Sequence, residues 1–449
     1  MTKWHEVKLG DVCIKITDGS HWSPKTCEVG FPMASVKDME EYKINLSSCR
    51  KISKEDYQEL VKNDCKPLKN DVLIAKDGSY LKQAFEVKTE EDVVILSSIA
   101  IIRPNLNLIL PTFLKYIFKN QEFIEIVKKN YVSGAVIPRI ILKDFKNIPI
   151  SLPPLEIQKK IAGVLSALDD KIELNNKINN NLEQQAQALF NEKIVNNSKQ
   201  GCIGDYCSIK SGFAFKSSWW QNTGVRVIKI KNIEPSGLNL QECSFVSEDK
   251  VSIAKEFIVK GGDLLIAMTG ATIGKFAIVP HVDEILLVNQ RVGKFFLGDN
   301  PLEKLPFIYC TLKQPEVVSE IINRGQGSAQ PNISGNDIMS ITCNYPDENI
   351  IAGFNNICRP YFEKIIINQY ENTRLAAIRD ALLPKLMSGE IDVSNVDISA
   401  LTSTDKLSFR CRSPPKNISY RFSCYFPLNL AICGIFPIFL CFFCIIYWI

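Results

Sequence analysis

Two stretches of the chain repeat apolar residues at alternating steps of four and three, and they match each other at an offset of 193 residues. This spacing predicts two long helices, each with a stripe of the coiled-coil type. The first, from Glu156 to about Lys193, would span about 57 Å at 1.5 Å per residue, so we expect a spacer or a docking platform. The stripe positions are Ile161, Leu165, Leu168, Ile172, Asn175, Asn179, Leu182, Ala186 and Leu189, then Phe354, Cys358, Tyr361, Ile365, Asn368, Asn372, Leu375, Arg379 and Leu382.

Both stripes carry asparagine at the same two central positions, Asn175 and Asn179 in the first and Asn368 and Asn372 in the second. A buried asparagine weakens an apolar stripe but fixes its register, because an unpaired amide is costly there. We therefore predict that these four residues set the register if the helices run antiparallel. The alternative is that they face solvent or a third partner.

The chain before each long helix has a mixed pattern of short β-rich runs, such as Val93–Leu96 and Val225–Ile228, between glycine and asparagine turns. A helix is expected at Pro111–Lys129, with a counterpart at Pro301–Asn323. Each of these regions is predicted to be an α/β globule.

Short motifs also recur between the two globules, which indicates a tandem duplication. The pairs are Leu9–Asp11 with Ile203–Asp205, Asp71–Ala75 with Asp263–Ala267, and Gly134–Ile140 with Gly327–Ile333. We expect a mixed α/β chain of duplicated domains joined by two long helices. The predicted parts are a first globule at 1–152, a first long helix at 153–200, a second globule at 201–345, a second long helix at 346–392 and an atypical tail at 393–449.

The composition changes abruptly in the tail. Five of the 15 cysteines lie in its last forty residues, and Leu428–Ile449 is an uncharged run long enough to span a bilayer. We expect a segment appended after about Ser399 by a frameshift or a lost stop codon; a membrane anchor is the alternative. The N-terminus has no apolar signal-peptide core, so reduced cysteines and a cytoplasmic location are expected.

The net charge of +4 comes from the tail, because residues 400–449 hold five Lys or Arg and one acid. The remaining chain is balanced in charge. Any binding to nucleic acid must therefore come from local patches and from shape, and not from a global field.

A search for catalytic motifs finds none. Gly270–Phe276 is similar to a phosphate-binding loop, but it is one residue short between its glycines and has Phe where Ser or Thr would bind magnesium, so a tight turn is expected. The acidic start at Pro346–Glu348 is not followed by the rest of a nuclease motif, and His5, His21 and His281 are isolated. We predict a protein that is not itself an enzyme.

Binding signals are clearer than catalytic ones. Arg, Gln and Asn read guanine and adenine edges, whereas Lys binds phosphates. These types gather in glycine-containing loops after the predicted globule helices and in a further cluster at Asn289–Arg291. The alternative is that these are ordinary solvated loops. The DNA-binding candidates are Lys128, Lys129, Ser133, Arg139, Gln290, Arg291, Arg324, Gln326, Gln330 and Asn332.

With these motifs in place, the chain resembles the specificity subunit of a Type I restriction-modification enzyme over residues 6 to about 392. The resemblance is carried by the repeated motif at 327–333 and 134–140, the helix start at 153–161 and the ending at 382–391. One departure is that Ile137–Arg139 stands where the second copy has Gln-Pro-Asn.

The resemblance implies two target recognition domains, each reading half of a split sequence in double-stranded DNA. It also implies that the long helices pair as an antiparallel coiled coil that sets the spacing. The implied partners are two methyltransferase subunits and the restriction subunits, which would hold S-adenosylmethionine, ATP and magnesium, with no cofactor on this chain. Two alternatives stay open: a related system whose partner fuses methyltransferase and nuclease, and a coiled-coil scaffold without a DNA role.

Overall fold

The computed structural model describes residues 4–76, 83–133, 139–140, 142–197, 199–234, 237–326 and 331–398. The chain divides into two compact units, Met1–Ser394 and Asn395–Ile449, and every helix and strand below belongs to the first.

The first globule is built on four small sheets. The central one is antiparallel, in the order β2-β8-β5-β6; a second joins β4-β3-β7, with β3 and β7 parallel; and β1 pairs with β11. The strands are β1 (His5–Lys8), β2 (Cys13–Asp18), β3 (Phe31–Ala34), β4 (Arg50–Ile52), β5 (Val72–Ala75), β6 (Ala84–Glu86), β7 (Val94–Ile95), β8 (Ile99–Pro104) and β11 (Pro149–Leu152). The helices are α1 (Lys54–Lys62), α2 (Pro111–Lys119), α3 (Gln121–Tyr131) and α4 (Leu142–Phe145), and β9 (Val132–Ser133) pairs with β10 (Arg139–Ile140).

The second globule repeats this arrangement with an enlarged second sheet. Its sheets are β13-β23-β20-β21, β14-β18-β15-β22-β19, β12-β24 and β16-β17. The strands are β12 (Gln200–Cys202), β13 (Ser208–Ser211), β14 (Trp220–Gln221), β15 (Val225–Ile228), β16 (Ile233–Glu234), β17 (Gly237–Leu238), β18 (Ser244–Val246), β19 (Ile258–Val259), β20 (Leu264–Ala267), β21 (Phe276–Ile278), β22 (Leu286–Val288), β23 (Val292–Phe296) and β24 (Thr342–Asn344). The helices are α6 (Ile203–Tyr206), α7 (Lys250–Ile253), α8 (Leu305–Leu312), α9 (Pro315–Gly325) and α10 (Gly335–Met339).

The repeated Asp71–Ala75 motif has the same structure in both copies. The aspartate accepts a backbone N–H three residues before it, from Leu68 at 2.8 Å in the first copy. Asp263 accepts the N–H of Lys260 at 2.9 Å in the second. The four apolar residues that follow form β5 and β20, which are buried along their whole length. The motif is thus a capped turn leading into the central strand of each core.

The prediction of a single helix at Pro111–Lys129 is wrong, because the structure has two helices there. The counterpart region of the second copy is also divided into separate helices. In the first copy Asn120 ends α2, and its side chain accepts the N–H of Glu122 at 3.1 Å at the start of α3. In the second copy Pro315 begins α9, and a proline cannot donate the N–H that would continue α8.

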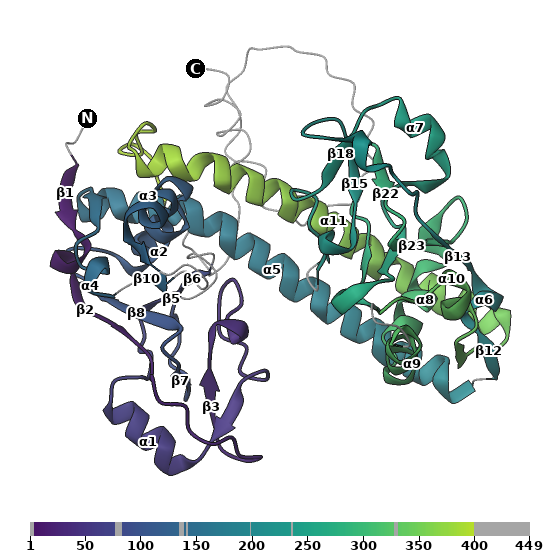
Figure 1. The fold of residues 1–449 in the computed structure, drawn as a ribbon, viewed down its shortest axis with the longest axis horizontal. Coiled ribbons are helices and arrows are strands. Elements are labelled where there is room, and N and C mark those ends of the chain that lie inside the picture. The colour runs from purple at the N-terminus through teal and green to yellow at the C-terminus, as the bar shows by residue number, and fades with distance from the viewer. Residues whose placement is uncertain are drawn as a thin grey trace, which may run out of the picture. The chain divides into compact units, whose positions relative to one another are not determined.

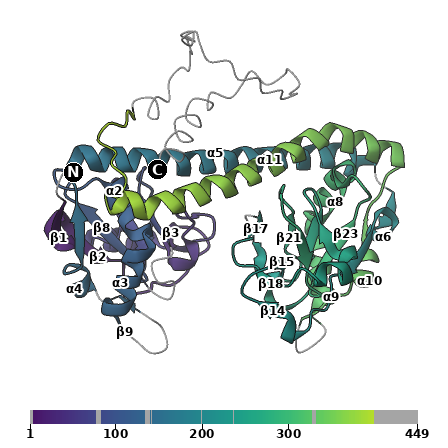
Figure 2. The ribbon, with the colours of Figure 1, turned by 90° about the horizontal axis from the view of Figure 1, so that it is seen from above.

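The two long helices are confirmed as α5 (Leu155–Lys193) and α11 (Glu348–Met387). They lie side by side over most of their length (Figures 1 and 2). The predicted stripes face inward: of their central residues, Ile172, Asn179 and Asn368 are buried. The first globule packs α2 against α5, and the second packs α8 against both α5 and α11.

No helix within the described residues is long and apolar enough to cross a membrane. The apolar run Leu428–Ile449 lies outside the described residues, so the predicted origin of the tail stays a prediction.

Candidate nucleic-acid interface

Three loops of the second globule meet at one end of the sheet β13-β23-β20-β21. The N–H of Met268, after β20, donates to the carbonyl of Arg291, before β23, at 3.0 Å. The N–H of Ile333 donates to the carbonyl of Met268 at 3.0 Å, and that of Gly270 to the carbonyl of Pro331 at 2.9 Å. Antiparallel pairing places the end of β20 beside the start of β23, so candidates far apart in sequence come together.

The segment similar to a phosphate-binding loop is confirmed as a turn. It begins with a single 3₁₀ turn, Gly270–Thr272, between β20 and β21. Gly270 and Gly274 have φ values of +72° and +81°, the left-handed conformation that favours glycine. The turn contributes to the same surface, because Thr269 forms a β-bridge with Asn332.

Four of the DNA-binding candidates are exposed around this loop cluster: Gln290, Arg291, Gln326 and Asn332. The backbone N–H of Asn332 donates to the carbonyl of Gly325 at 2.9 Å, which anchors the segment while leaving the side chain free to point outward. Gln330 lies outside the described residues. Base reading by these residues stays a prediction.

Arg324 differs from its neighbours because its guanidinium is already engaged by the protein. Its Nε donates to Glu320 at 2.7 Å, and its Nη1 donates to the carbonyl of Asp337 at 2.8 Å and to the hydroxyl of Ser340 at 2.6 Å. The two Nη1 bonds tie α9 to α10. To read a base through these atoms, Arg324 would first have to release them.

In the first globule, four candidates gather around the end of α3. Lys128 forms an ion pair with Glu125 at 2.9 Å on the same helix, and Lys129 is exposed. The strand register pairs Ser133 with Arg139, so the backbone brings these two together; the placement of their side chains is not described. Figure 2 shows β9, which carries Ser133, on the side of its globule away from α5 and α11.

A cluster of aromatic and lysine side chains beside the second loop cluster was not among the sequence candidates. Phe213 forms a β-bridge with Asn289, directly next to Gln290, and its ring stacks on Trp219 with centroids 6.2 Å apart. The ammonium of Lys229 lies 3.5 Å from the centre of the Trp220 ring. We call this the aromatic–lysine cluster; its members are Phe213, Phe215, Lys216, Trp219, Trp220, Lys229 and Lys250. The four aromatic residues around Lys216 at 213–220 were the available signal.

Lysines among aromatic rings suit a phosphate backbone beside stacked bases. Burial, aided by the neighbouring Lys231, lowers the pKa of Lys229, whereas Lys216 is exposed at the edge of the cluster. The exposed lysine is therefore the one best placed to meet a phosphate.

The equivalent end of the first sheet holds different side chains. There the N–H of Lys76 donates to the carbonyl of Ser98 at 2.9 Å. This hydrogen bond is the equivalent of the one from Met268 to Arg291 in the second globule. The Lys76 ammonium pairs with Asp18 at 2.5 Å, and His21 lies 3.2 Å from the same carboxylate oxygen. Asp18 and His21 line a cleft of about 430 Å³. The two globules therefore present unlike surfaces at equivalent places.

The four asparagines of the helix stripes meet one another across the pair. Asn368 Nδ2 donates to Asn179 Oδ1 at 2.7 Å, and Asn175 Nδ2 donates to Asn372 Oδ1 at 2.9 Å. Residue numbers fall along α11 as they rise along α5, so the two helices run in opposite directions. That the asparagines set the register stays a prediction.

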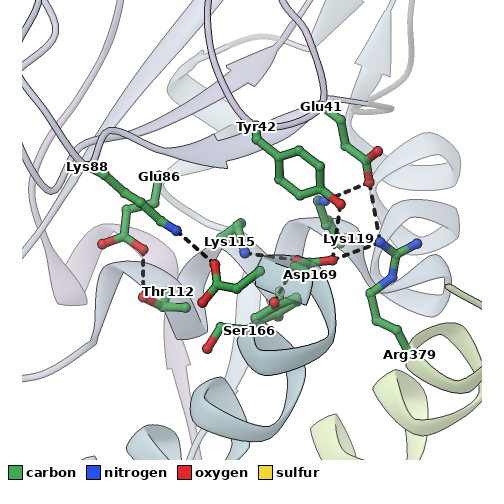
Figure 3. Close-up of polar contacts among 12 residues, drawn as sticks. Glu41, Tyr42, Glu86, Lys88, Thr112, Lys115, Lys119, Ser166, Asp169 and Arg379 are labelled. Carbon is green, nitrogen blue, oxygen red and sulfur yellow. Dashed lines mark hydrogen bonds and ion pairs between the residues drawn. The ribbon is translucent and has the colours of Figure 1, made fainter. Parts of the chain in front are cut away.

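A buried carboxylate joins the first globule to both long helices (Figure 3). Asp169 of α5 accepts from Lys115 at 3.1 Å and from the hydroxyl of Tyr116 at 2.7 Å, both on α2. It also accepts from Arg379 of α11 at 2.8 Å. The Asp169 side chain is only 3% exposed. Glu41 lies 3.3 Å from Arg379 at the edge of the cluster.

The charges of this junction stabilise one another. Burial alone would raise the pKa of Asp169, but Lys119, Lys115 and Arg379 outweigh it, and its pKa lies well below the ordinary value. Burial lowers the pKa of Lys115, although Asp169 opposes the change. The carboxylate is thus charged at any physiological pH.

Among the described residues, no group of three or more His, Cys, Asp and Glu side chains is arranged to hold a metal ion.

Two similar globules with polar loops at one sheet end, joined by two long packed helices, define a duplicated binding protein. A family model described as Type I restriction modification DNA specificity domain matches residues 1–184 and 196–359. The chain belongs to this family.

Relatives with established names are similar over most of the chain. The Type I restriction enzyme MjaVIII specificity subunit of Methanocaldococcus jannaschii is 27% identical over 349 residues, which cover 73% of this chain and 80% of that protein. The HindI specificity subunit of Haemophilus influenzae is 23% identical and is covered completely by 87% of this chain. A crystal structure of the Type-I restriction-modification system S subunit from M. genitalium covers 86% of this chain and 96% of its own, with 18% identity and a TM-score of 0.48.

Proposed function

We propose that this chain is the DNA-reading subunit of a restriction-modification complex and that it recognises a target in two halves. The observation that carries the proposal is the duplication: each globule has its own set of polar side chains at the equivalent end of its structure. Two such globules on one helix pair suit two short sequences separated by a stretch of unread DNA.

In this proposal α5 and α11 form an antiparallel coiled coil that holds the globules at a fixed distance. The asparagine contacts between the helices and the buried stripe residues support it. The helix pair then acts as a spacer, and the globules act as readers.

The chain itself carries out no reaction in this proposal. Methyl transfer and cleavage belong to two methyltransferase subunits and to restriction subunits, which hold S-adenosylmethionine, ATP and magnesium. The names of the similar specificity subunits support this division of labour. The complex works on cytoplasmic DNA.

The test is to sequence the methylated sites of a host that expresses the chain with its neighbouring genes. A modified sequence in two parts is expected, and exchanging the second globule for that of a relative should change one part only. A continuous site, or a change in both parts, would contradict the proposal. A scaffold without a DNA role predicts no site at all, and a fused methyltransferase-nuclease partner would be identified from the purified complex.

A further inference from the structure

The two ends of the helix pair differ in chemistry although the duplication makes them equivalent. At the offset of 193 residues, Asp169 corresponds to Phe362 and Arg379 to Ala186. In place of the ion pair between Lys115 and Asp169, the second end has an edge-to-face contact between the rings of Tyr309 and Phe362, with centroids 5.0 Å apart. Ala186 is fully buried there.

The duplication also makes a second pairing of the helices available. Because α5 and α11 carry matching stripes, α5 has the pattern to pair with α5 of another copy, and α11 with α11. The asparagines do not prevent this homotypic pairing. In it Asn175 would meet Asn179, and Asn368 would meet Asn372, so an amide still faces an amide.

Asp169 and Arg379 do distinguish the two pairings. Between two α5 helices, Asp169 would meet Ala186 and would keep Lys115 and Tyr116 from its own globule. Between two α11 helices, Arg379 would meet Phe362, and its inward Nη1 would lose Asp169. The Arg379 side chain is only 14% exposed in the observed pair, so the loss would leave a largely buried charge facing a ring. Asp380, half exposed on the same helix, bonds only to Nε.

We propose that the contact between Asp169 and Arg379 selects the partner of each long helix. It makes α5 pair with α11 of the same chain and disfavours pairing with the equivalent helix of a second copy. The asparagines align the helices, whereas this ion pair decides which helices are aligned. This proposal concerns only the assembly of the helices, so its test does not depend on whether the chain recognises DNA.

The test uses the folded full chain with a protease site inserted after Asn197. Cutting the linker after folding leaves an N-terminal half with α5 and a C-terminal half with α11, and native mass spectrometry then measures which halves associate. We expect the two halves of the chain without a substitution to stay together after cutting, as a complex of one N-terminal and one C-terminal half. In Arg379→Leu, the ratio of homotypic to mixed complexes should rise by at least about a hundredfold.

Arg379→Gln removes the same charge with less change in shape and should behave in the same way, which keeps the test informative if Arg379→Leu folds poorly. Arg379→Lys should keep the mixed complex. The matched control is Arg359→Leu, which removes an exposed arginine that pairs with Glu363 on its own helix, 3.4 Å away. The proposal would be overturned if both Arg379→Leu and Arg379→Gln formed only complexes of one N-terminal and one C-terminal half. It would also be overturned if Arg359→Leu formed homotypic complexes to the same extent as these variants.

Discussion

Asn368 of α11 donates a hydrogen bond to the side chain of Asn179 of α5 across a distance of 2.7 Å, and both residues are buried between the long helices. Replacing either residue alone with leucine leaves the other amide unpaired, and we expect a loss of about 1 to 3 kcal/mol in the free energy of unfolding. Replacing both should recover most of this loss. Urea unfolding of the two single variants and the double variant measures the coupling, and Asn180→Leu, at an exposed position, is the control. Additive losses would show that the two amides act independently.

The helix pair should act as a ruler for the spacing of the two half-sites. One extra heptad after Asn180 in α5, together with one after Ile366 in α11, adds about 10 Å and preserves the facing of both stripes. DNA rises about 3.4 Å per base pair, so the unread spacer should lengthen by about three base pairs while both half-sites stay the same. Sequencing of methylated sites checks this. A heptad in α5 alone is the control, and it should disrupt the pair because the asparagine contacts and the packing of the end of α5 on the second globule can no longer both be kept. An unchanged spacer with the double insertion would rule out the ruler.

Substitutions of Arg324 and of the exposed residues near it should have different effects: the first should lower the stability of the fold, and the others should weaken DNA discrimination. Arg324→Ala removes two bonds between α9 and α10 and one bond to Glu320 within α9, and we expect the free energy of unfolding to fall by about 1 kcal/mol, since the side chain is partly exposed to solvent. Gln326→Ala and Asn332→Ala should change stability by less than about 0.5 kcal/mol but weaken discrimination at the second half-site. Thermal unfolding and competition binding with altered duplexes measure the two effects. Unchanged discrimination in both exposed variants would mean that these residues do not read bases.

Lys216, at the exposed edge of the aromatic–lysine cluster, should contact a phosphate and not a base. We expect Lys216→Gln to weaken binding equally on cognate and unrelated DNA, and to reduce the slope of log K against log salt by about one. Titrations at several salt concentrations provide the measurement. Lys364→Gln, at an exposed site on α11, is the control and should leave the slope unchanged. A selective loss on cognate DNA would instead make Lys216 a reader.

The parts of the fold that repeat at short range could be predicted from the sequence. The steps of four and three predicted α5 and α11, and Val225–Ile228 became β15 with the expected bounds. The division at Asn120 was missed because it depends on one side chain capping the next helix, which helical periodicity does not reveal.

The contacts of the candidate site depend on long-range packing and could not be predicted in the same way. The sequence singled out Gln290 and Asn332 by residue type, but only the turn around Met268 brings their segments together. Asp169 lies on the helix face that meets α2 and Arg379, and nothing in the local pattern shows that three distant segments converge on it.

The unlike junctions also determine which pieces of this chain can be exchanged with those of its relatives. A new first globule that ends before Pro153 leaves Asp169 and Arg379 behind on the helices, so it must bring its own cation and hydroxyl in the places of Lys115 and Tyr116. A new second globule must bring a ring in the place of Tyr309. Moving the first globule into the second position would set Lys115 against Phe362. The helix pair therefore has two different junctions with the globules. A globule taken from a relative by recombination fits only the junction that matches its own contact residues.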